Sequence, residues 1–114
     1  MALLLFQKGR ELATDNLSVL FVASEVEGLI KSGGLADVAK ALPEALRDLQ
    51  QDVRIAVPAY TGIEQLSQAE TVLEADLTCW PYTPYRVLRL TLGETPVYLI
   101  DCPPYFNRPS MYAE

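Results

Sequence analysis

The chain has 114 residues, half of them hydrophobic, and a formal net charge of −6. This length is enough for one small domain with a packed core, and an acidic chain without a basic cluster argues against nucleic acid or an anionic membrane as partner. The chain contains no histidine, which excludes a Ser-His-Asp triad within it and leaves no histidine to join Cys79 and Cys102 in a zinc site. We expect these cysteines to be free thiols in a reducing cytoplasm.

Residues 1–16 show no clear periodicity, and their second half is polar. The apolar run at 2–6 is too short to span a bilayer, and no basic residue precedes it, so it makes a poor signal peptide. We interpret residues 1–16 as an N-terminal extension and expect a frayed tail.

Residues 17–24 are nearly all apolar and predict a parallel strand that is buried on both faces. A loop follows at 25–34, and then comes a predicted helix at 35–49. Its apolar residues recur at helical spacing and predict one buried stripe, formed by Leu35, Val38, Leu42, Ala45, Leu46 and Leu49. Residues 53–57 predict a second strand that ends at Pro58. Strand, helix and strand in this order predict a βαβ unit with parallel strands, in which ligands bind at the carboxyl ends of the strands.

The loop between the first strand and the helix carries Lys31, Gly33 and Gly34. A glycine-rich turn at a helix N-terminus can bind an anion, because free N–H groups and the helix dipole meet there. The lysine precedes the glycines, so the loop is not a P-loop, and no G-x-G-x-x-G is present. On the residues alone, a tight strand-to-helix turn with a solvated lysine is an equal alternative, since many α/β folds have such turns and bind no phosphate.

Residues 58–68 predict a loop with a short helical turn. Strands are predicted at 70–78, 85–92 and 97–101, with a turn at Gly93-Glu94, and they add an antiparallel meander to the sheet. Residues 101–114 contain three prolines and predict a loop, whose aromatic residues suggest that it packs on another part of the molecule.

Residues 25–38 resemble the N-terminus of bacterial glycogen synthases and plant starch synthases. That family opens with a strand, a Ser-Glu pair, a Lys-Thr-Gly-Gly-Leu-Ala-Asp-Val loop and an Ala-Leu-Pro helix. Further matches follow in the family's order, at residues 41–43, 52–54, 57–60, 97–101 and 105–109. The resemblance runs from about Leu17 to the last residue, so we interpret residues 17–114 as the truncated N-terminal portion of such a catalytic domain.

The resemblance implies a retaining glucosyltransferase with two Rossmann-like domains, which needs no metal and no other cofactor. Such an enzyme moves glucose from ADP-glucose to the non-reducing end of an α-1,4-glucan. The implied fold class is α/β: the Rossmann-like βαβ start of a GT-B N-terminal domain, incomplete, with a mostly parallel sheet and an added β-meander. No nucleic acid and no membrane is implied as partner, and the implied location is cytoplasmic.

Three binding residues carry over from the family motif. Lys31 matches the lysine that contacts the phosphate of the nucleotide sugar. Gly33 and Gly34 match the glycines whose backbone N–H groups face that phosphate, where a side chain would block its approach.

Three further matches are assigned to catalysis. Glu25 and Asp37 match acidic positions near the glucosyl or acceptor site, and Tyr112 matches a tyrosine near the sugar. Asp37 has an equal alternative, because an acid in the first helical turn also complements the helix dipole. Tyr112 could equally be a packed loop aromatic.

The chain departs from the family pattern in the loop and in length. Ser32 stands where threonine is most common and keeps the hydroxyl, whereas Glu27 adds a negative charge near the predicted anion site. The family is several times longer, and its C-terminal domain supplies most nucleotide contacts. We therefore expect no catalysis by these residues alone, and self-association through uncovered surfaces.

Two other functions are weighed against this one. The first is a non-catalytic module that binds an anion or associates with itself. The second is a flavodoxin-like or response-regulator-like domain, and we find neither the phosphoacceptor aspartate nor the later lysine that a response regulator needs.

Overall fold

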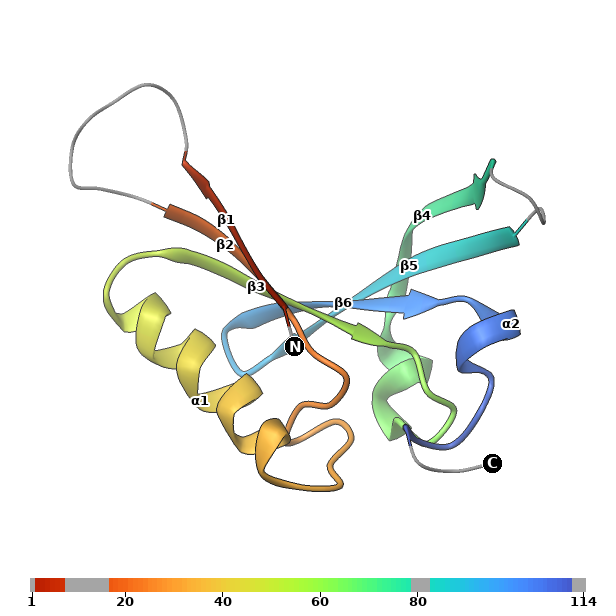
Figure 1. The fold of residues 1–114 in the computed structure, drawn as a ribbon, viewed down its shortest axis with the longest axis horizontal. Helices are drawn as coiled ribbons and strands as arrows, with labels where there is room; N and C mark the ends of the chain where they lie inside the picture. The colour runs from red at the N-terminus through yellow and green to blue at the C-terminus, as the bar shows by residue number, and fades with distance from the viewer. Residues whose placement is uncertain (1, 8–16, 79–82, 112–114) are drawn as a thin grey trace.

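The computed structural model describes residues 2–7, 17–78 and 83–111. Six strands form one sheet in the order β1-β2-β3-β6-β5-β4 (Figure 1). The strands are β1 (Ala2–Gln7), β2 (Leu17–Val22), β3 (Asp52–Pro58), β4 (Glu70–Leu77), β5 (Thr83–Leu92) and β6 (Thr95–Asp101). The helices are α1 (Gly34–Asp48), the short 3-10 helix η1 (Glu64–Gln68) and the single turn α2 (Pro103–Phe106).

The centre of the sheet is parallel, as the sequence predicts. β3 pairs in parallel with β2 on one side and with β6 on the other, and α1 connects β2 to β3. β4, β5 and β6 form the predicted antiparallel meander. The α/β class and the Rossmann-like start are thus confirmed, but the sheet as a whole is mixed rather than mostly parallel. The tight turn at Gly93-Glu94 is one cause, because so short a connection can only join antiparallel strands.

The first strand corrects the expectation of a frayed tail. β1 pairs antiparallel with β2 over its full length, from Ala2 opposite Val22 to Gln7 opposite Leu17. Without β1, β2 would be an edge strand with a free row of backbone N–H and C=O groups, and a nearby apolar run can satisfy them by pairing. Residues 8–16 lie outside the described residues.

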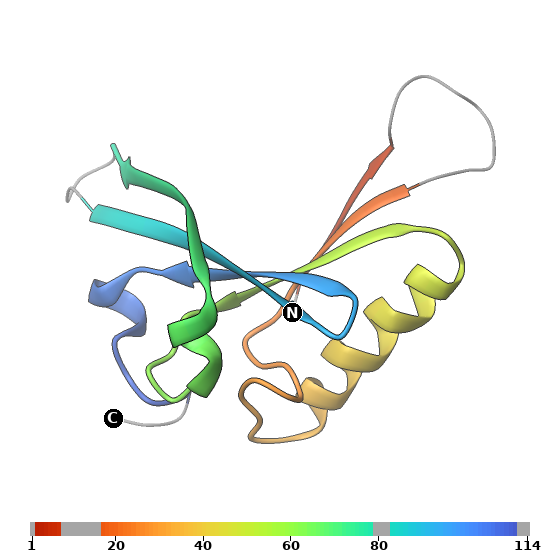
Figure 2. The same ribbon diagram turned by 180° about the vertical axis from the view of Figure 1, so that it is seen from behind.

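The core lies between the sheet and α1 together with η1. Alternate residues of β3 point into it, so Val53, Ile55 and Val57 are at most 1% exposed. The core continues through Phe21 on β2, and the further members of the cluster include Ala39, Ile63, Leu88, Val97 and Leu99. Figures 1 and 2 show α1, η1 and α2 on the same side of the sheet, and no other helix is present among the described residues.

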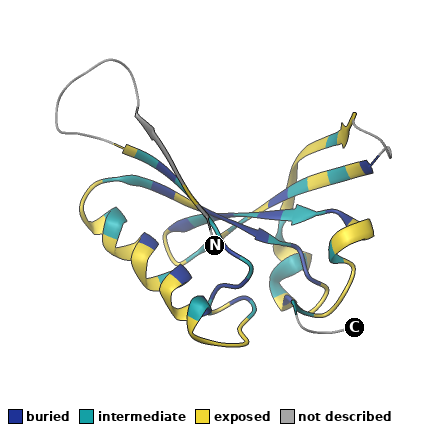
Figure 3. Ribbon diagram, in the orientation of Figure 1, coloured by how far each residue is buried: buried dark blue, intermediate teal, exposed yellow. Residues whose placement is uncertain are grey.

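The buried face of α1 differs from the predicted one. α1 buries Ala36, Ala39 and Pro43, whereas Val38 and Leu42 are 45% and 38% exposed. The buried face is therefore turned by one residue, about 100° around the helix. Small residues at the contact let α1 approach the sheet closely, and the larger apolar residues flank the contact. Figure 3 shows the exposed outer surface of α1 beside the buried strands.

Candidate functional site

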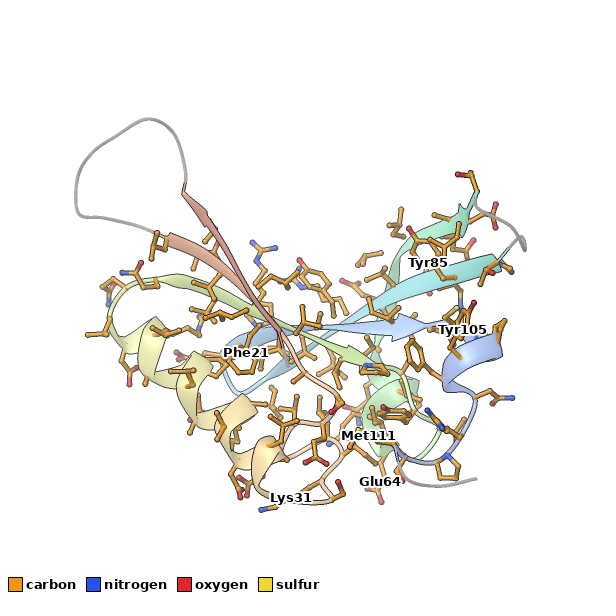
Figure 4. All side chains as sticks on the ribbon, viewed as in Figure 1. Phe21, Lys31, Glu64, Tyr85, Tyr105 and Met111 are labelled. Carbon is orange, nitrogen blue, oxygen red and sulfur yellow. The ribbon has the colours of Figure 1, made fainter. Side chains whose placement is uncertain are left out.

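Three loops meet at the carboxyl edge of the parallel strands. They follow β2 (residues 23–33), β3 (59–63) and β6 (the segment from α2 to residue 111). The Gln65 side-chain amide donates to the Gly28 carbonyl at 2.7 Å, which ties the first loop to η1, directly after the second loop. Thr61 N–H donates to the Arg108 carbonyl at 2.9 Å, which ties the second loop to the third. In Figure 4, Lys31, Glu64 and Met111 lie at this end of the molecule.

The loop after β2 folds back on itself before α1 begins. Val26 N–H donates to the Ile30 carbonyl, and Ile30 N–H donates to the Val26 carbonyl, both at 3.0 Å. Gly28 makes this turn possible, because its φ of +95° is strained for residues with a side chain. Val26 and Leu29 anchor the loop in the core.

Glu25 is buried where α1 begins, with 4% of its surface exposed. Its carboxylate accepts a hydrogen bond from Ser32 N–H at 2.8 Å and another from the Ser32 hydroxyl. The Ser32 hydroxyl lowers the pKa of Glu25 most; burial opposes it, and the backbone N–H groups of Ser32, Ala36 and Gly33 lower that pKa further. A carboxylate of the chain itself therefore uses donors at the predicted anion site.

Lys31 is paired with Asp37 at the surface. Its Nζ donates to Asp37 Oδ1 at 2.6 Å, and the two side chains are 45% and 51% exposed. The hydrogen bond to Asp37 raises the pKa of Lys31 most, and the charges of Asp37, Glu27 and Glu25 add to the rise. The same hydrogen bond lowers the pKa of Asp37. The structure thus brings together two residues that the sequence assigns to different parts of the site.

Neither glycine before α1 is required by its neighbours in this chain. Gly33 has an extended backbone with φ −168°, which any residue can adopt. A Cβ at Gly34 would have no heavy atom within 4 Å, and one at Gly33 would meet only Glu25 Oε1, at 3.9 Å. Packing therefore leaves room for a side chain, or for a ligand, at both positions.

The third loop reaches the site through a close backbone contact that sequence reasoning missed. Gly62 N–H donates to the Pro109 carbonyl at 3.1 Å, and a Cβ on Gly62 would lie 2.3 Å from that oxygen. The Tyr60 and Phe106 rings meet edge to face at 6.2 Å. Burial raises the pKa of Tyr60. A glycine five residues after the predicted strand end is the only sequence signal of this contact. Tyr112 itself lies outside the described residues.

An apolar cavity of about 390 Å³ lies at the carboxyl ends of β2, β3 and β6. Its lining consists of Val22, Ala23, Ser24, Ala56, Val57, Pro58, Ile100 and Phe106. Among residues 2–7, 17–78 and 83–111, no three His, Cys, Asp or Glu side chains are placed to hold a metal ion. No helix in those ranges has the length and apolar character needed to cross a membrane. Cys102 is a buried free thiol, and Cys79 lies outside the described residues.

Comparisons with known proteins agree over nearly the whole chain. A family model described as the starch synthase catalytic domain matches residues 18–114. Over 103 residues, the chain is 80% identical to a glycogen synthase of Vibrio parahaemolyticus serotype O3:K6 and 65% identical to one of Vibrio vulnificus strain YJ016. Each of these matches covers 90% of this chain and 21% of the relative.

A solved structure gives the same result. The catalytic domain of Starch Synthase IV from Arabidopsis thaliana, bound to ADP and acarbose, superposes with a TM-score of 0.70 at 25% sequence identity. The match covers 88% of this chain and 22% of that one.

Fold, loop and comparisons together define the Rossmann-like N-terminal unit of a GT-B glycosyltransferase. The chain belongs to the family of starch synthase catalytic domains. It spans about a fifth of the length of the curated relatives that it matches.

Proposed function

We propose that the chain is the N-terminal portion of a glycogen synthase. The whole protein would transfer glucose from ADP-glucose to the non-reducing end of an α-1,4-glucan in the cytoplasm. The observation that carries this proposal is the 80% identity to the Vibrio parahaemolyticus glycogen synthase, within a family match over residues 18–114. We further propose that these 114 residues require the C-terminal domain for catalysis, because the nucleotide lies in the cleft between the two domains.

In this proposal, Lys31 and the backbone N–H groups of Gly33 and Gly34 bind the phosphates of ADP-glucose. The leaving diphosphate gains charge in the transition state, and fixed donors that face it lower the barrier. The room at both glycines supports this role, since no close contact within the described residues explains why two adjacent side chains are absent. Lys31 supports it by its exposure and its position in the same loop.

The acidic residues and Tyr112 are assigned to the sugar side of the site. Glu25 is buried beside the loop, so its first effect is to fix Ser32 and thereby the path of the backbone toward Gly33. Asp37 lies beside Lys31 in the first turn of α1. Tyr112 follows the segment that Gly62 holds at the edge of the sheet. We propose that all three contribute to the glucosyl or acceptor side.

A chimera tests the proposed function directly. The matched 103-residue segment of the Vibrio parahaemolyticus glycogen synthase is replaced by the corresponding segment of this chain, and glucose transfer from labelled ADP-glucose to glycogen is measured. We expect the chimera to keep kcat/KM within about tenfold of the parent, and the 114-residue chain alone to show no transfer. A folded chimera without transfer would refute the proposal.

The binding role of Lys31 needs a matched control in the same chimera. Lys31→Ala should lower kcat/KM by at least about tenfold, because a charge-assisted hydrogen bond to phosphate is lost. Lys40→Ala removes the same charge from a partly buried position on α1 and should leave kcat/KM unchanged. Equal effects of the two substitutions would mean that Lys31 acts only through net charge.

A further inference from the structure

The Lys31 ammonium already forms an ion pair within this chain. Its Nζ is held at 2.6 Å by Asp37, which lies six residues further on, in the first turn of α1. We propose that Asp37 is an internal counter-ion of Lys31, which a phosphate group must displace, so that Asp37 weakens anion binding by the loop. This inference rests on the proposed function in taking a phosphate group as the ligand.

The charges around Lys31 support the competition. Glu25 is buried at the start of α1, and Glu27 is half-buried in the same loop. The charges of Asp37, Glu27 and Glu25 all raise the pKa of the Lys31 ammonium. One ammonium thus faces three carboxylates. One positive and three negative charges sum to −2, so the loop's own acids repel an incoming anion, which must compete with the nearest of them for Lys31.

The exchange of partners is easy on structural grounds. Both side chains of the pair are about half exposed, and such ion pairs contribute little to stability. Lysine carries its charge on a flexible stem with rotatable donors, so Nζ can turn to a new acceptor while the backbone stays in place. Asp37 keeps a favourable position after release, because an acid in the first helical turn is stabilised by the helix dipole.

The test uses the 114-residue chain, inorganic pyrophosphate and calorimetry at low ionic strength. Asp37→Asn keeps the size of the side chain and one acceptor oxygen but removes the charge. We expect the affinity for pyrophosphate to rise about threefold, as one partly screened charge beside the site is removed. Asp48→Asn is the matched control, because it makes the same change at the exposed end of α1, roughly 16 Å away at 1.5 Å per residue. It should leave the affinity unchanged.

A second readout needs no ligand. The pKa of Lys31, followed by NMR of its side chain, should fall in Asp37→Asn and stay unchanged in Asp48→Asn. Circular dichroism checks that each variant is folded. The inference is overturned if folded Asp37→Asn binds pyrophosphate no better than the parent chain, or if neither binds it at all, since freeing Lys31 would then have created no anion site.

These outcomes are separate from those of the proposed function. Tighter pyrophosphate binding by Asp37→Asn together with an inactive chimera would support Asp37 as the counter-ion of Lys31 and refute the glycogen synthase proposal. An active chimera together with an unchanged pyrophosphate affinity of Asp37→Asn would support the glycogen synthase proposal and overturn the role of Asp37 as counter-ion.

Discussion

Replacing Gly62 by alanine tests how the third loop is held against the second. An alanine Cβ at this position would lie 2.3 Å from the carbonyl oxygen of Pro109. The obstacle is backbone rather than a flexible side chain, so the two loops must move apart by about 1 Å to reach an ordinary contact distance. That movement stretches the hydrogen bonds from Gly62 N–H and Thr61 N–H, which are now 3.1 and 2.9 Å long, beyond useful length.

The expected cost follows from these contacts. Two backbone hydrogen bonds contribute about 1 kcal/mol each, and overpacking adds about 1 kcal/mol more. Alanine in place of glycine restricts the unfolded chain and returns about 0.7 kcal/mol. Gly62→Ala should therefore lower the free energy of unfolding by about 2 kcal/mol.

Urea unfolding followed by circular dichroism measures this change, with Gly34→Ala as the matched control. A Cβ at Gly34 meets nothing within 4 Å, and alanine has the higher helix propensity, so this variant should be as stable as the parent or more so. Hydrogen exchange should be faster at the amides of residues 61 and 62 in Gly62→Ala. Equal stability of Gly62→Ala and the parent would refute the close contact.

Three further predictions concern pH, the core and a turn. The folded-state pKa of Glu25 lies below its ordinary value of 4.5, so the ionised carboxylate stabilises the fold above that pH and this stabilisation is lost as the pH falls through the folded pKa. When urea unfolding midpoints are measured against pH, Glu25→Gln should show a smaller loss of stability at acidic pH than the parent chain. Phe21→Ala should cost about 3–5 kcal/mol in urea unfolding, because the side chain is fully buried, and a loss below about 1 kcal/mol would contradict its central place in the core. Gly93→Ala should cost about 1 kcal/mol by the same assay, since Gly93 has φ +63° at the β5–β6 turn, and a neutral result would contradict that conformation.

The sequence predicts the parts of the fold that depend on local patterns. The strand–helix–strand unit is found where periodicity places it, and α1 begins and ends within one residue of the predicted bounds. The turn at Gly93-Glu94 and the meander are also confirmed, because turn residues separate apolar runs there. Which face of α1 is buried could not be predicted. Ala39 is buried and Val38 is exposed because of how closely the helix approaches the sheet, and the periodicity of apolar residues does not predict that distance.

Contacts between segments that are distant in the chain could not be predicted from the sequence either. β1 joins the sheet because β2 offers a free edge, and only the assembled sheet shows that edge. In the candidate site, the position of Lys31 and the two glycines at the carboxyl edge follows from the order of elements. The contact between Glu25 and Ser32 does not, because a seven-residue separation across a loop has no characteristic spacing. The docking of Pro109 on Gly62 joins segments 47 residues apart and depends on tertiary structure throughout.

The two faces of the sheet explain why the loops can be ordered in so short a chain. The loop after β2 is anchored by Val26 and Leu29, and the loop after β3 by Ile63, and all three belong to the same core cluster as Phe21. The opposite face takes little part in that cluster. There Arg54 donates to the Tyr98 hydroxyl at 2.5 Å and lies over its ring, which places a charge on the uncovered surface. The geometry around Lys31 is therefore set by contacts on the covered face.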